Sequence, residues 1–374
     1  ERAFDALDSL ILTQLVYMPF EGFLDRGESH TVRECWAFLR DYVEPEKLDR
    51  FQQKRYRLTE VCAGLPRYQD WQMHDYVNHI DREQNIQFCA ACYNLDDGAV
   101  CVSFRGTDLN IAGWVEDMNM SFMVVPAQEE AARYVADIAA RTEGPLELTG
   151  HSKGGNLAAW AAIYLPAELQ KDRLLSAYNN DGPGFARDML DTPEYRRVAD
   201  KLHTYIPESS IVGVLLEHAE DYAVIDSANR SIMQHEPLSW SVVGTRFVHL
   251  GQRSQMGRLS DDVLREWIGS MTPAEREQFT DALFDVLSLS GKARTLDDLR
   301  SGGLAGGAAL LKQYAGADEE KKKIIAEIFR RLAVDVKDEL KKAAGEGFEG
   351  MKKAAGEGLE GVKTVLTNLT KGEK

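Results

Sequence analysis

Apolar and polar residues repeat with two different periods along this chain. Residues 4–23, FDALDSLILTQLVYMPFEGF, carry apolar side chains at helical spacing, and we expect residues 1–80 to be mainly helical. Residues 85–107 instead resemble two strands joined at 96–98, because an Asp-Gly pair between strand-like runs is a strong hairpin signal. The first third of the chain therefore changes from a helical to a strand period.

Strands and helices alternate through the middle of the chain. The pattern predicts an amphipathic helix over 127–141, a buried strand over 145–150 and an alanine-rich helix over 155–165. Two further strands are expected at 174–181 and 201–207. Because parallel strands need crossover connections, usually helices, this alternation favours an α/β fold with a mainly parallel central sheet covered on both faces.

The last third of the chain has a different organisation. Residues 222–250 are again strand-rich, and residues 258–315 have helical spacing with a glycine-rich break at 301–309. We therefore divide the chain into an α/β domain over 1–255, a helical extension over 256–318 and an amphipathic tail over 319–374.

The tail contains an eleven-residue repeat, KKAAGEGFEGM at 341–351 and KKAAGEGLEGV at 352–362. Eleven residues make three helical turns of about 3.67 residues. One stripe then collects Ala344, Phe348, Met351, Ala355, Leu359, Val362 and Leu366. A helix with an apolar stripe and lysine-rich flanks resembles helices that lie in a lipid interface. The three glycines per repeat, each costing about 1 kcal/mol relative to alanine, favour a flexible tail, with the lipid interface and docking on the body of the protein as alternatives.

Composition and charge exclude some classes of protein. The 374 residues are 44% hydrophobic and 9% aromatic, as in globular proteins, and the net charge of −16 argues against a nucleic-acid partner. From residue 321 onward there are 13 basic and 9 acidic residues, so the tail carries +4 and the rest of the chain −20. The sequence has no run of about 18 consecutive apolar residues, so we predict no transmembrane helix. No signal-peptide pattern is present either, although a chain that starts at Glu1 leaves an upstream export signal open.

The five cysteines indicate no metal or redox centre. Cys89 and Cys92 form a CxxC, but on a strand residues three apart face opposite sides, so we expect small buried side chains. No His, Cys and Asp cluster has metal-ligand spacing, and we expect neither a metal nor a cofactor. The odd cysteine count favours a cytoplasmic protein, with peripheral membrane contact through the tail as an alternative. The oligomeric state stays open.

A serine lies on a glycine-rich bend, GHSKG at 150–154, between a predicted strand and a predicted helix. This G-x-S-x-G context is that of a nucleophile elbow, in which Gly150 and Gly154 remove clashes around a strained serine. The turn would present Ser152 at the carboxyl edge of the sheet, with the Lys153 backbone N–H at the helix N-terminus ready to stabilise an oxyanion. The alternative is a purely structural glycine turn.

A second segment, VCVSFRGTDLNIAGWVEDMNMSF at 100–122, strengthens the nucleophile hypothesis. FRGT, followed by Trp and Asp and placed about 45 residues before GHSKGGNLA, resembles the class 3, or fungal-type, triacylglycerol lipases. More closely, residues 5–245 resemble an uncharacterised bacterial lipase-like family of the α/β-hydrolase superfamily. The motifs that carry this resemblance are LDSLILTQLVYMPFEGF, FRGTD, GHSKGGNLA, NNDGPGF and QHEPLSW.

The resemblance implies an α/β-hydrolase fold with a helical N-terminal segment. It also suggests roles for residues near the nucleophile. In the related lipases the residue that matches Thr107 supplies the second oxyanion N–H. Arg105 is expected to be a structural ion-pair partner, for example of Asp117. Relatives usually carry an apolar residue where this chain has Lys153, so we expect a charge on the helix surface, with attraction of anionic head groups as the alternative.

A triad needs a histidine after the serine, and this chain offers four. His235 lies in SIMQHEPLSW, a loop after a strand pair, and matches the histidine motif of the family. His249 is the alternative base. His203 falls within a predicted strand, and His218 is expected to be solvated.

The acid is less well defined by the sequence. Fungal-type lipases place it after the second strand that follows the nucleophile, where this chain has Ser209 and Ser210 instead of aspartate. We therefore weigh Asp181, which ends the first strand after the nucleophile, with Glu208 as the alternative. Asp181 could also serve only as a turn cap.

Together these features predict a serine acyl hydrolase acting on carboxylic esters of lipid-like or apolar substrates. Ser152 would attack, His235 would take its proton, and the N–H groups of Thr107 and Lys153 would hold the oxyanion. Two alternatives remain: a catalytically degenerate lipase-fold binding module, and a thioesterase, amidase or acyltransferase that uses the same site.

Overall fold

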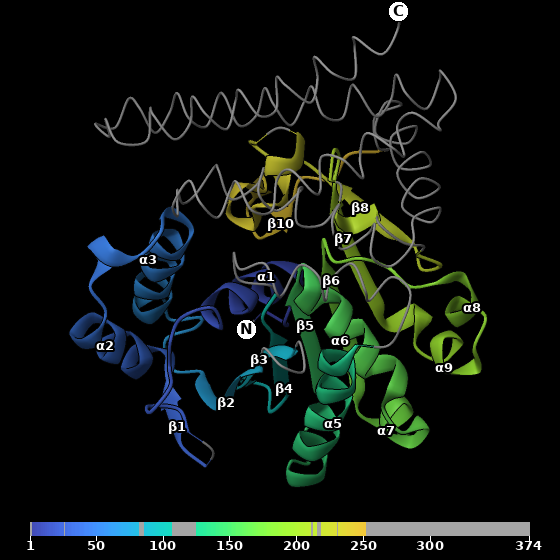
Figure 1. Ribbon diagram of the computed structural model, residues 1–374, viewed down its shortest axis with the longest axis horizontal. Helices are drawn as coiled ribbons and strands as arrows, with labels where there is room; N and C mark the ends of the chain where they lie inside the picture. The colour runs from blue at the N-terminus through green and yellow to red at the C-terminus, as the bar shows by residue number, and fades with distance from the viewer. Residues whose placement is uncertain are drawn as a thin grey trace, which may run out of the picture.

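In the computed structural model, one large sheet organises the described part of the chain (Figure 1). The structure describes residues 2–25, 27–81, 86–106, 125–210, 212–214, 218–229 and 231–251. Eight strands follow one another in the sheet in chain order, from β1 to β8. The predicted extension over 256–318, the tail over 319–374 and its eleven-residue repeat lie outside the described residues.

The first half of the chain supplies the antiparallel strands and three helices that pack on them. The elements are α1 (Ala6–Leu15), β1 (Ser29–Thr31), α2 (Val32–Tyr42), η1 (Pro45–Lys47), α3 (Arg50–Gly64), β2 (Gln72–Asp81), β3 (Ile86–Asn94) and β4 (Val100–Phe104). β1 to β4 pair antiparallel in sequence. The predicted hairpin between β3 and β4 is confirmed, and Gly98 takes the positive φ of 83° that its tight turn needs.

The second half supplies the parallel strands and their crossover helices. The elements are α5 (Pro126–Arg141), β5 (Leu146–His151), α6 (Lys153–Tyr164), α7 (Ala167–Asp172), β6 (Leu174–Asn180), α8 (Arg187–Leu190), α9 (Pro193–Arg196), η2 (Ala199–Lys201), β7 (Leu202–Pro207), η3 (Val212–Val214) and β8 (Tyr222–Ile225). Each strand from β4 to β8 pairs in parallel with the next. The chain therefore has an α/β fold, as the alternating pattern predicts.

The described segment after β8 is less regular than the predicted strand-rich region. It contains η4 (Ser231–His235), η5 (Pro237–Ser239), β9 (Val242–Val243) and β10 (Arg246–Phe247). The two short strands form a separate antiparallel pair. Isolated bridges from Ile225 to His249 and from Ser227 to Trp240 tie this segment to the end of β8.

The ten-residue strand β2 lies inside the region predicted to be mainly helical. Its register against β3 shifts between His74 and Val77, and Asp75 there has a positive φ of 51°. Such a bulge interrupts the two-residue alternation by which strands are found in a sequence. The helical period of α1 and α3 therefore dominates the pattern of residues 1–80.

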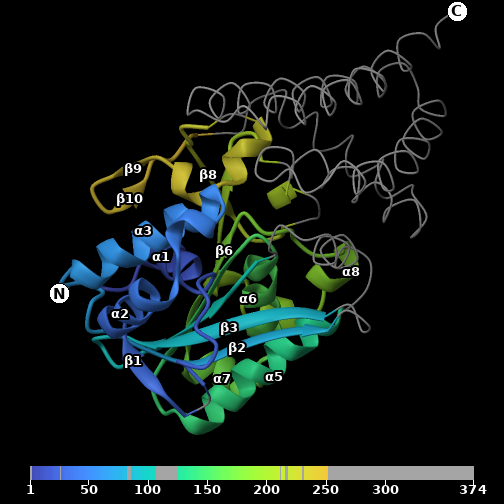
Figure 2. The ribbon, with the colours of Figure 1, turned by 60° about the vertical axis from the view of Figure 1, so that its left-hand side comes forward.

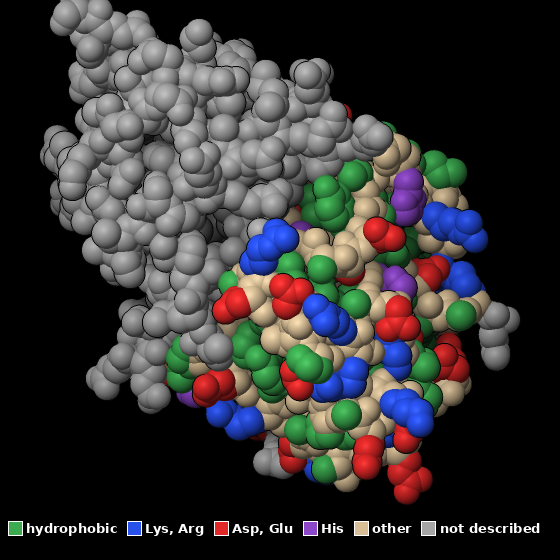
Figure 3. Space-filling model, turned by 90° about the vertical axis from the view of Figure 1, so that its right-hand side faces the viewer, with side chains coloured by type: hydrophobic (Ala, Val, Ile, Leu, Met, Phe, Trp, Pro, Cys, Tyr) green, Lys and Arg blue, Asp and Glu red, His purple; other side chains and the backbone are tan. Residues whose placement is uncertain are grey.

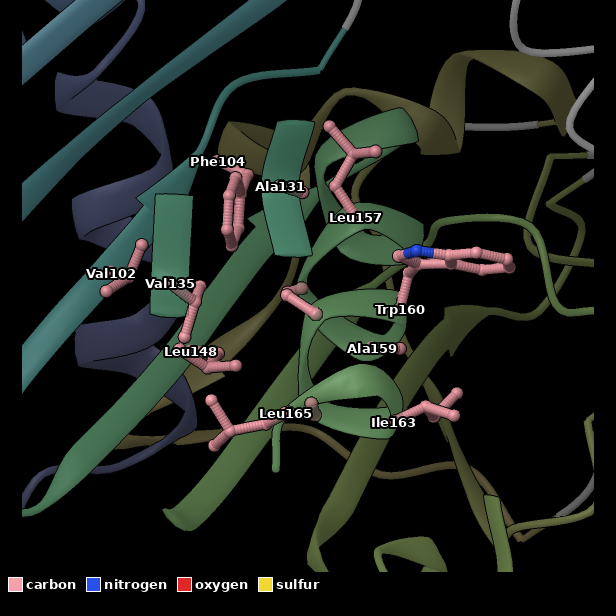
Figure 4. Close-up of a cluster of buried hydrophobic side chains, with 14 of the residues drawn as sticks. Val102, Phe104, Ala131, Val135, Leu148, Leu157, Ala159, Trp160, Ile163 and Leu165 are labelled. Atoms are coloured by element: carbon pink, nitrogen blue, oxygen red, sulfur yellow. The ribbon is translucent and has the colours of Figure 1, made fainter. Parts of the chain in front are cut away.

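Helices cover both faces of the sheet, and each face has its own hydrophobic core (Figure 2). On one face α5 and α6 pack on β4 and β5, bringing Phe104, Val135, Leu148 and Leu157 together (Figure 4). On the other face α1, α2 and α3 pack over β2 to β4. Alternation along β3 sends Cys92 into the first core and Cys89 into the second, as expected for a CxxC on a strand.

The surface of the described region carries interspersed charges. Figure 3 shows lysines and arginines mixed with aspartates and glutamates on one face. In the described part of the chain, no helix has the length and hydrophobicity that crossing a bilayer requires.

A buried carboxyl group lies in the central strand. Glu147 of β5 is only 5% exposed, and its Oε2 has no hydrogen-bond partner within the described residues. Burial, and next the charge of Asp97, raise the pKa of Glu147 to about 8. An acid with a raised pKa in the folded state holds its proton there while the unfolded chain releases it, so this group weakens the fold as pH rises from about 4.5 to 8.

Replacement of this side chain by an uncharged one should make the fold less sensitive to pH. We expect E147Q to gain stability relative to the wild type, with the gain growing by on the order of 2 kcal/mol between pH 5 and pH 7. Urea unfolding at both pH values measures the difference, and E129Q on the exposed face of α5 is the control. A gain that does not change with pH would contradict the assignment.

Candidate active site

The predicted elbow is formed at the junction of β5 and α6. Ser152 has φ 59° and ψ −131°, a strained conformation for a residue with a side chain. A Cβ on Gly150 would lie 1.9 Å from the Gly154 carbonyl oxygen, and one on Gly154 would lie 2.2 Å from the Phe104 carbonyl oxygen. Both glycines are therefore required by backbone contacts, as the G-x-S-x-G pattern predicts.

Three of the predicted site residues form one hydrogen-bonded chain. The Nε2 atom of His235 lies 2.9 Å from Ser152 Oγ, and its Nδ1 lies 2.7 Å from Asp181 Oδ2. The serine and the aspartate are buried, and the histidine is 18% exposed. With Nδ1–H donating to the carboxylate, Nε2 is left to accept the serine proton, which is the tautomer a general base needs.

The acid comes from the turn after β6. Asp181 has a positive φ of 55°, and its backbone N–H donates to the Tyr205 carbonyl oxygen over 2.9 Å. A Cβ on the following residue, Gly182, would lie 2.3 Å from the Ser152 carbonyl oxygen, so only glycine lets this turn approach the elbow. Asn156 of α6 donates to the Pro183 and Gly184 carbonyl oxygens. The motif NNDGPGF thus folds the acid beside the nucleophile.

The alternative candidates lie elsewhere. His249 is exposed and neighbours the Tyr205 ring, with 6.3 Å between ring centroids. Glu208 is half-buried at the end of β7, while the Nδ1 atom of His235 is bonded to Asp181. His203 lies on β7 as predicted, stacked on Tyr178.

The expectation that His218 is solvated is wrong. Its side chain is 4% exposed, with Nδ1 3.0 Å from Glu220 Oε1 and Nε2 2.8 Å from the Gly213 carbonyl oxygen. Burial raises the pKa of Glu220, but hydrogen bonding and charge from His218 outweigh it and bring the pKa to about 2. No sequence pattern predicts this pair, because Glu220 lies two residues after His218 in an irregular loop. The pair fastens the loop whose Gly213 adjoins Asp181 Oδ1.

The expectation that Lys153 is a surface charge is also wrong. This side chain is 1% exposed, and its Nζ donates to the Gln87 carbonyl oxygen of β3 over 2.8 Å. The long aliphatic stem lets the ammonium reach from the elbow past β4 to β3. Arg105 is buried as well and donates to Asn78 Oδ1 over 2.9 Å.

The oxyanion side of the site is described in part. Lys153 is the first residue of α6, so its backbone N–H lies in the first turn, at the positive end of the helix dipole. The other predicted donor, Thr107, lies outside the described residues, and so does Asp117, the suggested partner of Arg105.

Sequence reasoning assigned no role to Tyr17, which borders the site. A Cβ on Gly106 would lie 2.5 Å from the Tyr17 hydroxyl and 3.1 Å from Ser152 Cβ. The Arg55 guanidinium of α3 stacks over the Tyr17 ring at 3.7 Å. The motif QLVYMPF signals this position only by its similarity to relatives, because residue 17 approaches Gly106 only in the folded chain.

The loop that carries the histidine is anchored by its own motif, QHEPLSW. Gln234 accepts a hydrogen bond from the Ser209 backbone N–H over 2.7 Å. The Trp240 indole N–H donates to the Gln234 carbonyl oxygen over 2.8 Å, and Glu236 pairs with Lys54 of α3 at 3.2 Å. Side chains on both sides of His235 therefore fix its loop to α3 and to the end of β7.

This arrangement can deliver a serine oxygen to an electrophile with a base and an acid in line behind it. Within the residues that the structure describes, no group of three or more His, Cys, Asp or Glu side chains could hold a metal ion.

Comparison with known proteins identifies the family. No curated protein matches the chain. The sequence profile of the Mbeg1-like family, which is lipase-like, matches residues 62–285, more than half of the chain. The matched region includes the elbow, the aspartate turn and the histidine loop, whereas α1 and most of α3 precede it. The chain belongs to the Mbeg1-like family.

Proposed function

We propose that the protein is a serine acyl hydrolase that cleaves carboxylic esters of lipid-like or apolar substrates. The observation that carries the proposal is the hydrogen-bonded chain from Asp181 through His235 to a serine with strained backbone. A hydroxyl alone is a weak nucleophile, and a neighbouring base held by a carboxylate is the arrangement that activates it.

In the acylation step Ser152 Oγ attacks the ester carbonyl carbon while its proton passes to His235 Nε2. The carboxylate of Asp181 stabilises the imidazolium that forms and does not take up the proton itself. The imidazolium then protonates the leaving alcohol, and an acyl-serine ester remains. Water, deprotonated by the same nitrogen, attacks this ester and releases the acid and free Ser152.

The tetrahedral intermediate needs donors for its negative oxygen. The Lys153 backbone N–H lies next to the nucleophile in the chain and at the positive end of the α6 dipole. We assign the second donor to the Thr107 backbone N–H, because the matching residue supplies it in the class 3 lipases that this chain resembles.

One observation favours hydrolysis over a lipase-fold binding module. The binding alternative was motivated by the serines at 209 and 210, where relatives have the acid. In this chain Asp181, which follows the preceding strand β6, makes the hydrogen bond to His235 that the acid of a triad makes. The lipase-like family supports an ester as substrate, while a thioester or amide could react by the same steps.

Removal of the nucleophile or the base should abolish turnover. We expect S152A to hydrolyse no short-chain nitrophenyl ester above background, and H235A to lose at least about 10³-fold in kcat. Steady-state kinetics on the full chain measures both variants. H249A, an exposed histidine in the same region, is the matched control and should keep the wild-type rate. Full activity in H235A with loss in H249A would reverse the assignment of the base.

The two candidate acids can be separated by neutral isosteres. We expect D181N to lose on the order of 10³-fold or more in kcat, because an amide cannot hold the tautomer that His235 needs. E208Q should keep most of the activity, because the Nδ1 atom of His235 is already bonded to Asp181. Equal, small losses in both variants would indicate an acid elsewhere or a Ser-His dyad.

A further inference from the structure

A second histidine lies against the proposed base and has no part in the mechanism above. His151 is the last residue of β5, next to the nucleophile, and it is 4% exposed. Its ring lies tilted against that of His235, with 4.6 Å between ring centroids and 33° between the planes. The same ring forms an edge-to-face pair with Trp240, at 6.1 Å between centroids.

The hydrogen bond of this ring defines its tautomer. His151 Nε2 lies 2.9 Å from the backbone carbonyl oxygen of His235, and a carbonyl can only accept, so Nε2 carries the proton and donates. Nδ1 is buried without a hydrogen-bond partner among the residues described. Burial, then the nearby His235 and Arg55, hold the pKa of His151 well below its ordinary value, so the ring is neutral.

The hydrogen bond from His151 joins the end of β5 to the short 3-10 helix η4, which lies outside the large sheet. Ser152 and His235 are 83 residues apart, and the base lies in a short 3-10 helix outside the large sheet. Sheet register therefore sets the position of the nucleophile but not that of the base. The hydrogen bond from His151 ties the backbone of the base directly to the strand residue before the nucleophile.

We propose that His151 is a positioning residue, whose Nε2–H holds the His235 backbone at the distance from Ser152 that proton transfer requires. The inference rests on the proposed hydrolase function and assigns part of its rate to a residue outside the triad. The neutral ring can lie against His235 while the base is an imidazolium, because it adds no second positive charge. Arg55, from α3, and Trp240 also lie near His151.

Two nearly isosteric substitutions separate the hydrogen bond from the packing. Glutamine reaches as far as imidazole Nε2 and carries an N–H, whereas methionine has similar length and no donor. We expect H151M to lose between about tenfold and a hundredfold in kcat with KM changed by less than about twofold, because a small misplacement of a catalytic group costs rate rather than binding. H151Q should return kcat to within about threefold of the wild type.

Kinetics on a soluble ester and thermal melting of the full chain provide the readouts. H203M, a half-buried histidine stacked on Tyr178 away from the nucleophile, is the matched control and should keep the wild-type kcat. Wild-type kcat in H151M, or equal losses of kcat and Tm in H151M and H151Q, would overturn the positioning role while leaving the hydrolase intact. A wild-type protein without turnover would overturn the proposed function and this inference with it.

Discussion

The backbone strain at Ser152 is the constraint around which the rest of the site is built. A residue with a side chain at φ 59° and ψ −131° persists only where its surroundings over-determine it. Here Gly150 and Gly154 allow a strand and a helix to meet closely enough to enforce the turn, and Gly182 lets the aspartate turn approach its carbonyl. The same closeness places the turn that carries Asp181 beside the elbow.

The two halves of the molecule contribute differently to this site. The parallel half supplies the nucleophile and acid at the carboxyl ends of β5 and β6, where α/β folds usually place their chemistry. The N-terminal helices, largely outside the matched family region, hold the groups around it. Lys54 pairs with Glu236 beside the base, and Arg55 lies over Tyr17. The helical layer is therefore a structural part of the site and more than a cover for the sheet.

The sequence predicted the features that depend on residues close together along the chain. The elbow, the β3–β4 hairpin and the alternation of β5, α6 and β6 follow from local periods and turn residues, and the structure contains all of them. β2 was missed because its bulge at Asp75 breaks the strand period. Lys153 and His218 were placed on the surface because their buried partners, the Gln87 carbonyl and a paired Glu220, are not visible from charge and spacing.

The central claim, that Ser152 is an activated nucleophile, is tested most directly by mapping a covalent adduct. The full chain would be incubated with an alkyl fluorophosphonate at neutral pH, digested and analysed by mass spectrometry. We expect one phosphonylated residue, Ser152, formed at a rate far above that in H235A, because only a serine with a working base attacks such a probe readily. An unmodified Ser152, or an adduct that forms equally fast without His235, would contradict it.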